Sequence, residues 1–162
     1  RDRALPQLAL SPLGRSYQGV ISSLDASGGY VTTGLAAVAG SGTSSDIEDL
    51  AALIGRVARS TGRVAIGSDA PAVPIGSGFH EELATLELAG ISPSELLRWA
   101  TAGGAIALGV SQQLGTVEPG RLADLVIVDG DPLRSITALS RIEAVVRDGV
   151  WIEPTELSRP IN

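Results

Sequence analysis

The clearest pattern of hydrophobic and polar residues lies between residues 45 and 69. Apolar residues recur there at the spacing of one helix face, at Ile47, Leu50, Ala51, Ile54, Val57 and Ala58. Ser45 and Glu48 have the spacing of a capping box, and Gly62 stands where a C-terminal cap is expected, so a helix is predicted between them. The apolar run at residues 64–69 follows directly and is typical of a strand buried on both faces of a parallel sheet. A helix and a strand joined by a short turn form one unit of an α/β fold.

Two further helices are predicted after a loop rich in proline and glycine. Residues 80–89 have helical spacing and end at Gly90, and Ser92 followed by Pro93 is typical of the start of another helix. Residues 1–44 carry several glycine turns and no motif, although residues 30–33 have the composition of a strand. We therefore treat 1–44 as an unassigned, loop-rich segment.

The last third of the chain changes to the period of strands. Strands are predicted at residues 122–128, 142–147 and 150–152, and the Asp148-Gly149 pair between the last two is a strong hairpin signal. Asp129 and Asp131 bracket a turn, and we assign them a structural role. The sequence thus divides into the unassigned segment, an α/β segment at 45–114 and an antiparallel β segment at 115–162.

Composition narrows the classes of function. The 162 residues are 44% hydrophobic and 19% charged, which suits one domain with a core. The net charge is −6 and no basic cluster is present, so we expect no nucleic-acid partner. The sequence has no cysteine, which excludes disulfides and thiolate metal ligands. No apolar stretch approaches the ~20 residues of a membrane helix, so we expect no membrane association and take a cytoplasmic location as the default.

Two side chains are candidates for chemistry. Asp69 ends the predicted strand, so its carboxylate is expected at the carboxyl edge of a parallel sheet, where barrel enzymes place catalytic residues. There a carboxylate can bind a metal or take a proton from bound water, although spacing alone favours a cap on the following turn. His80 is the only histidine and can serve as ligand, acid or substrate contact, although its position favours a partly exposed residue at a helix start. Glu81, Glu82 and Glu87 fit a solvated helix face.

Four segments in order resemble the amidohydrolase superfamily. They are Val64-Ala65-Ile66-Gly67-Ser68-Asp69-Ala70-Pro71, His80-Glu81-Glu82-Leu83, Gly90-Ile91-Ser92-Pro93 with Ala100-Thr101, and Leu114-Gly115-Thr116-Val117-Glu118-Pro119-Gly120-Arg121-Leu122-Ala123-Asp124-Leu125-Val126. The last is the most specific, and it is similar to the segment that follows the barrel in imidazolonepropionase-like and prolidase-like members. One motif alone is weak evidence, but four in this order are strong. The resemblance covers roughly residues 62–152 and takes nothing from 1–44.

The resemblance implies an α/β fold, namely the C-terminal part of a (β/α)8 TIM-type barrel plus strands of a small β-sandwich assembled from both chain ends. It matches Asp69 with the family's last-strand aspartate, which contacts the metal-bound water and accepts and donates a proton. Asp69 is therefore the expected catalytic residue and metal contact, and Ser68 and His80 are the expected substrate contacts. The implied cofactor is a divalent metal, with zinc expected. The implied reaction is hydrolysis of a C–N bond in a small amide, cyclic amide or peptide-like substrate, whose identity the sequence does not give.

The sequence also departs from the family pattern. The family's His-x-His pair, its two further histidines and, in many binuclear members, its carbamylated lysine have no counterpart in a chain with one histidine and no lysine. Because a catalytic zinc site usually needs three protein ligands, we expect most ligands outside this chain. The chain opens Arg1-Asp2-Arg3 and lacks methionine, so we expect it to be processed, truncated or incompletely represented.

Three interpretations follow from the sequence. We favour the C-terminal part of an enzyme whose N-terminal half lies upstream. The second is a non-catalytic, degenerate barrel fragment that serves as a structural or interaction module. The third is a half-barrel completed by another chain or by a homo-oligomer, because unpaired sheet edges and apolar surface favour association.

Overall fold

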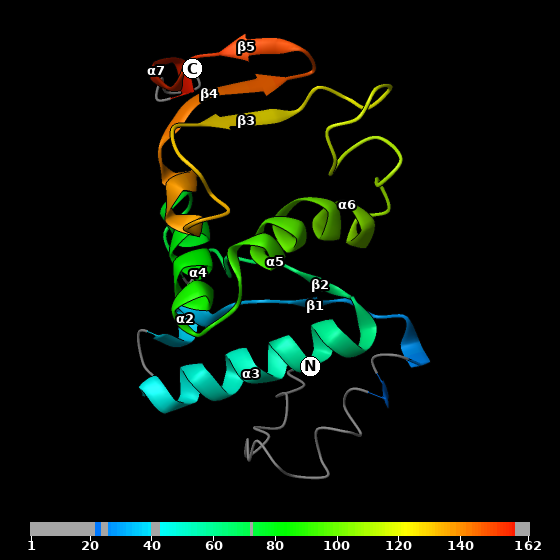
Figure 1. The fold of residues 1–162 in the computed structure, drawn as a ribbon, viewed down its shortest axis with the longest axis vertical. Helices are drawn as coiled ribbons and strands as arrows, with labels where there is room; N and C mark the ends of the chain where they lie inside the picture. The colour runs from blue at the N-terminus through cyan, green and yellow to red at the C-terminus, as the bar shows by residue number, and fades with distance from the viewer. Residues whose placement is uncertain (1–21, 24–25, 40–42, 72, 158–162) are drawn as a thin grey trace.

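The structure is a computed structural model that describes residues 22–23, 26–39, 43–71 and 73–157 (Figure 1). Two short helical turns precede Gly28. The elements then follow in the order β1 (Val31–Thr32), α2 (Leu35–Ala39), α3 (Ser44–Thr61), β2 (Val64–Ala65), α4 (Ser77–Leu88), α5 (Pro93–Arg98), the π-helix η1 (Trp99–Gly103), α6 (Gly104–Ala107), β3 (Leu125–Val128), the 3-10 helix η2 (Ile136–Ser140), β4 (Ile142–Arg147), β5 (Val150–Ile152) and α7 (Pro154–Leu157). None of the helices in these ranges is long and apolar enough to cross a membrane.

Helix α3 begins two residues earlier than the sequence pattern indicated. Thr43 is its N-cap: Asp46 N donates to Thr43 Oγ1 (3.3 Å) and Thr43 N donates to Asp46 Oδ2 (2.8 Å). The predicted box of Ser45 and Glu48 was wrong because an N-cap residue needs extended backbone, which Thr43 has (φ −86°, ψ 163°). The hydrogen bond from the Thr43 side chain, and then that from its backbone, lowers the pKa of Asp46. Gly62 ends the helix in the left-handed conformation (φ 65°), as predicted.

Strands β1 and β2 pair in parallel, in the register Val31 with Val64 and Thr32 with Ala65. Val64 and Ala65 are both buried, which confirms the prediction of a strand covered on both faces. The regular strand is shorter than the apolar run at residues 64–69. It ends because Gly67 N donates to the side-chain Oγ1 of Thr33 (3.3 Å) instead of to a backbone carbonyl of the neighbouring strand.

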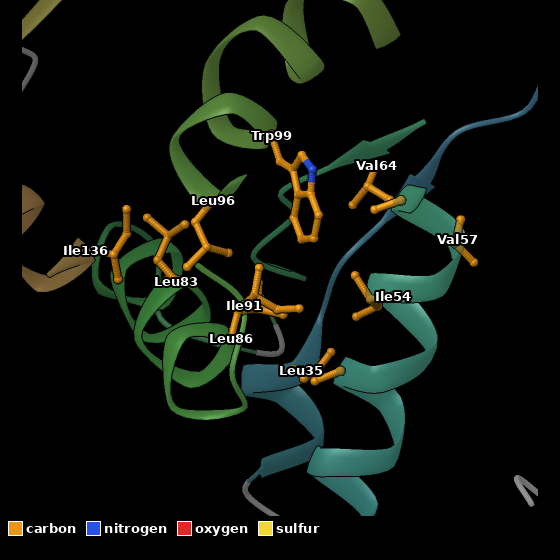
Figure 2. Packing of buried hydrophobic residues seen from close by; sticks show 12 residues of the cluster. Leu35, Ile54, Val57, Val64, Leu83, Leu86, Ile91, Leu96, Trp99 and Ile136 are labelled. Atoms are coloured by element: carbon orange, nitrogen blue, oxygen red, sulfur yellow. The ribbon is translucent and has the colours of Figure 1, made fainter. Parts of the chain in front are cut away.

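The core lies around these two strands. Strand β2 lies between α3 and the helical segment formed by α5, η1 and α6 (Figure 1). Ile54 of α3 points into the buried cluster, to which Val57 also belongs, and the Trp99 indole lies between Leu96 and Val64 (Figure 2). The Trp99 side chain is almost fully buried, and its Nε1 has no hydrogen-bond partner among the described residues. One apolar cluster therefore joins α3, β2, α4 and α5.

The two helices predicted after β2 are both present, and the start of the first differs from the prediction. Helix α4 starts at Ser77, three residues before His80, because Gly76 (φ 90°) turns the backbone and Gly78 N donates to Pro74 O (2.9 Å). Ser92 is the N-cap of α5 and accepts a hydrogen bond from Glu95 N, with Pro93 at the first helical position, as predicted.

The second sheet is antiparallel, in the order β3-β4-β5, and lies beyond α4 and η2 (Figure 1). The Asp148-Gly149 turn has positive φ at both residues (50° and 78°), which confirms the predicted hairpin. Asp148 N donates to Asp124 Oδ1 (2.7 Å), so the residue before β3 also fixes this turn. Strand β3 starts at Leu125 instead of residue 122, because Leu122 N already bonds to Gln113 O (2.9 Å) outside the sheet.

The close packing of η1 on β2 gives a first prediction. A Cβ on Gly103 would lie 2.8 Å from Val64 O and 3.2 Å from Arg98 O, whereas a Cβ on Gly104 would lie 3.8 Å from Trp99 O. Gly103→Ala should lower the free energy of unfolding by about 1–3 kcal/mol through overpacking. Gly104→Ala should leave it unchanged or raise it by up to about 1 kcal/mol, because alanine is the better helix former. Urea unfolding of the two purified variants distinguishes them, and an equal loss in both would contradict this packing.

Candidate functional site

Asp69 lies just after β2, at the carboxyl end of the parallel pair. Its side chain is exposed and makes no hydrogen bond or ion pair with any described residue. Its backbone is left-handed (φ 53°), a conformation that costs energy for most residues other than glycine and that aspartate tolerates better than most. Within the described chain Asp69 therefore does not cap the following turn, and its carboxylate faces solvent at the edge of the sheet.

The end of β1 forms the neighbouring part of this edge. Thr33 is buried, and its N donates to Ala65 O (3.1 Å) while its Oγ1 accepts from Gly67 N. A Cβ on Gly67 would lie 2.7 Å from Thr33 O, so only glycine fits this close approach. A Cβ on Gly34 would lie 3.7 Å from the Cβ of Asp69. The two strand ends therefore contact each other, and Asp69 packs beside Gly34.

The other two predicted site residues, Ser68 and His80, lie on different elements. Ser68 precedes Asp69 at the same edge and is half-buried. His80 is the fourth residue of α4, half-buried, with its ring edge-on to that of Phe79 at 6.2 Å between centroids. No hydrogen bond joins His80 to Asp69 or to Ser68 in the described structure. Their assignment as substrate contacts stays a prediction.

A divalent metal does not fit the described residues on their own. They contain no group of three or more histidine, cysteine, aspartate or glutamate side chains close enough to bind one ion. Asp69 supplies a single carboxylate where three protein ligands are usual. The expectation that most ligands lie outside this chain stays a prediction.

An open hollow lies elsewhere, over β3 and β4. It is lined by Asp124, Leu125, Val126, Val145, Val146 and Arg147. Its one carboxylate already accepts a hydrogen bond from Asp148 N. None of the predicted site residues lines it, so we place the candidate site at the edge of β1 and β2.

The prediction that the glutamates of α4 form a solvated face was wrong for two of them. Glu82 is fully buried, and its Oε2 accepts from Ala36 N (2.6 Å). Glu87 accepts from Ile136 N (3.1 Å) and Ser135 Oγ (3.2 Å), and so joins α4 to η2. Only Glu81 is exposed. The signal for Glu82 was present in the sequence, because it shares the apolar face of Phe79, Leu83 and Leu86 at helical spacing.

Residues 23–152, most of the 162-residue chain, match the family model described as the amidohydrolase family. The chain belongs to the amidohydrolase family. The match begins well before residue 62, where the sequence resemblance started, and includes β1 and Thr33. The sequence resemblance took nothing from residues 1–44, whereas the family match includes residues 23–44. The reason is that a two-residue strand between glycines gives only a weak periodic signal.

Individual relatives agree with this family. A 5-methylthioadenosine/S-adenosylhomocysteine deaminase of Syntrophobacter fumaroxidans is 50% identical over 46 residues, which are 28% of this chain and 10% of the deaminase. A Xaa-Pro dipeptidase with methionine bound in its active site has 27% identity and a TM-score of 0.58 over 65% of this chain and 26% of its own. A zinc-bound adenosine deaminase from Xanthomonas campestris, at 23% identity, shares the fold with a TM-score of 0.67 over 90% of this chain and 36% of its own.

These comparisons confirm the recognised family and the α/β class. In each case the matched region spans well under half of the relative's length. The described residues contain two parallel strands, and closure of a (β/α)8 barrel stays a prediction.

The contact between the strand ends gives a second prediction. Thr33→Val removes the acceptor of Gly67 N and should lower the free energy of unfolding by about 1 kcal/mol. Thr33→Ser keeps the hydroxyl and should retain most of that stability. Thermal unfolding of the two variants against the parent protein measures the difference, and equal stability of the valine and serine variants would count against the hydrogen bond.

Proposed function

We propose that this chain forms the C-terminal part of a metal-dependent amidohydrolase that hydrolyses a C–N bond of a small molecule. Family membership supports hydrolysis in general. Deamination and dipeptide cleavage, the activities named for two relatives, both break a C–N bond. The observation that carries the proposal is the position of Asp69, an exposed carboxylate without a partner in the described chain, at the carboxyl edge of a parallel sheet.

In this proposal Asp69 accepts a proton from the attacking water and returns it to the leaving nitrogen. A carboxylate performs both steps well when it can approach the water directly and has no competing partner. Exposure of Asp69 and the absence of a described ion pair support that role. Ser68 and His80 are proposed to contact the substrate, because Ser68 adjoins Asp69 and His80 follows in the next helix.

The proposed cofactor is a divalent metal, with zinc as the first choice. The chemistry that such an ion supplies is a water whose pKa is lowered toward ~7. Asp69 is the one residue of this chain proposed to approach the ion, and the other ligands are proposed to lie mostly outside this chain.

The same proposal assigns the two main parts of the chain to the domains of such an enzyme. Residues 45–114 form the end of a (β/α)8 barrel, and residues 115–162 contribute strands to a small β-sandwich. The parallel strand β2, whose partner β1 lies before residue 45, supports the first part, and the β3-β4-β5 sheet supports the second. Further strands would come from the remainder of a longer chain or from a partner.

A matched pair of substitutions tests the role of Asp69. Asp69→Asn should lower kcat for ammonia release from 5-methylthioadenosine or adenosine, or for proline release from methionyl-proline, by about 10²- to 10⁴-fold. Asp148→Asn is the control, because Asp148 is also exposed and also left-handed (φ 50°) but lies in the β4-β5 hairpin. Wild-type activity in Asp69→Asn would remove the proposed role of Asp69. Absence of C–N hydrolysis by the full-length protein on all three substrates would favour the non-catalytic interpretation.

Metal dependence has its own test. Dialysis of the active full-length protein against a chelator should abolish hydrolysis, and added zinc should restore it. Metal content is measured by mass spectrometry before and after dialysis. Full activity in protein that contains less than one divalent metal per hundred chains would contradict the proposal.

A further inference from the structure

Glu82 occupies a position where an apolar residue would be expected. It lies on the buried face of α4 with Phe79, Leu83 and Leu86, and its exposed fraction is 0%. Its Oε2 accepts from Ala36 N, and its Oε1 has no partner among the described residues. Burying a carboxyl group with one unpartnered oxygen is costly. An apolar side chain would avoid this cost, but it could not accept the hydrogen bond of Ala36 N.

The hydrogen bond of Glu82 ends on the segment that leaves β1. Ala36 is the second residue of α2, two positions after Gly34, and Gly34 packs beside the Cβ of Asp69. One residue earlier, Thr33 Oγ1 accepts from Gly67 N in the segment that leads to Asp69. The segment 33–36 is thus bonded to α4 at one end and to the residues before Asp69 at the other.

We propose that Glu82 is a positioning residue, which fixes segment 33–36 through Ala36 N and thereby fixes the direction of the Asp69 carboxylate. Without the Glu82 acceptor, Ala36 N would lose its bond to α4 and the segment beside Asp69 could shift. Displacement of a reacting group by about 1 Å can cost about 10²-fold in rate. The inference rests on the proposed function of Asp69.

The chain supplies a matched control for Glu82. Glu87 lies on the same helix, and it too accepts a backbone N–H from the start of a short helix, that of Ile136 in η2. Its bond lies toward the second sheet and away from the edge that carries Asp69. A loss of general stability should affect both variants, whereas a loss of positioning should affect only Glu82.

The first measurement is kinetic, on full-length protein with methionyl-proline or 5-methylthioadenosine. Glu82→Met should lower kcat by about 10- to 100-fold with little change in KM and in metal content. Glu82→Gln, whose amide oxygen can accept from Ala36 N, should restore most of kcat, and Glu87→Met should keep the parent kcat. In an Asp69→Asn background, Glu82→Met should cause no further loss, because it acts through Asp69.

The second measurement does not need a substrate. Amide hydrogen exchange followed by mass spectrometry should be faster in peptides that cover residues 33–37 and 66–70 in Glu82→Met, and unchanged there in Glu87→Met. If Glu82→Met does not fold, Glu82→Asp replaces it, because the shorter side chain cannot reach Ala36 N from the same helix position.

The outcomes separate the two proposals. Equal kcat and equal exchange in the Glu82→Met and Glu87→Met variants would overturn the positioning role. A further loss of the residual rate in the Asp69→Asn background, by the same factor as in the parent, would also overturn it and leave a merely structural role. Parent activity in Asp69→Asn would instead remove the proposed function of Asp69, while the exchange result would still decide whether Glu82 fixes segment 33–36.

Discussion

The parallel pairing of β1 with β2 is the contact around which the other described elements are arranged. Backbone hydrogen bonds from Val31 N to Arg63 O (2.9 Å) and from Thr33 N to Ala65 O (3.1 Å) extend it beyond the regular strands. Helix α3 connects the two strands and covers them with its apolar face, and η1 approaches Val64 closely enough to require Gly103. Because parallel strands end at the same edge, this pairing also brings residues 33–34 beside residues 67–69.

Two carboxyl groups of α4, buried Glu82 and half-buried Glu87, connect this edge to the second sheet. Glu82 bonds to the start of α2, and Glu87 bonds to the start of η2, which precedes β4. Each accepts a backbone N–H that a short helix leaves without an intrahelical partner. Helix α4 therefore fixes two parts of the chain that lie 46 and 49 residues away in sequence.

The segment from residue 114 to residue 126, the most specific motif of the sequence, has a structural role in what the structure describes. Gly115 (φ 97°) packs against Ala105, where a Cβ would lie 2.6 Å from the alanine methyl group. The Arg121 guanidinium donates to Ser111 O and pairs with Glu118 (3.1 Å). Asp124 accepts from Asp148 N. The residues of this motif therefore hold together the connection between α6 and the second sheet, whereas the candidate catalytic residue, Asp69, lies elsewhere.

The sequence by itself determined the features that depend on neighbours along the chain. The face of α3, the cap at Ser92 and the Asp148-Gly149 hairpin follow from local spacing, since helix periods, caps and tight turns involve residues within a few positions. The family was recognised separately, from the resemblance of four segments in their order along the chain. Asp69 was a candidate because it ends an apolar run, and the family resemblance made it the expected catalytic residue. Such patterns place a helix start only to within a few residues. Ser45 with Glu48 has the same spacing as Thr43 with Asp46, and the structure uses the second pair.

Only the tertiary structure decided what depends on contacts distant in sequence. The pairing of β1 with β2 over 33 positions, the bond from Gly67 to Thr33, and the burial of Glu82 against Ala36 have no local signature that fixes the partner. A glutamate on a helix is solvated or buried according to what packs on that face. The strand composition of residues 30–33 fits β1, but it did not indicate which strand β1 pairs with. The sequence therefore indicated Asp69 as the residue proposed to carry the chemistry, and the fold decided which residues surround it.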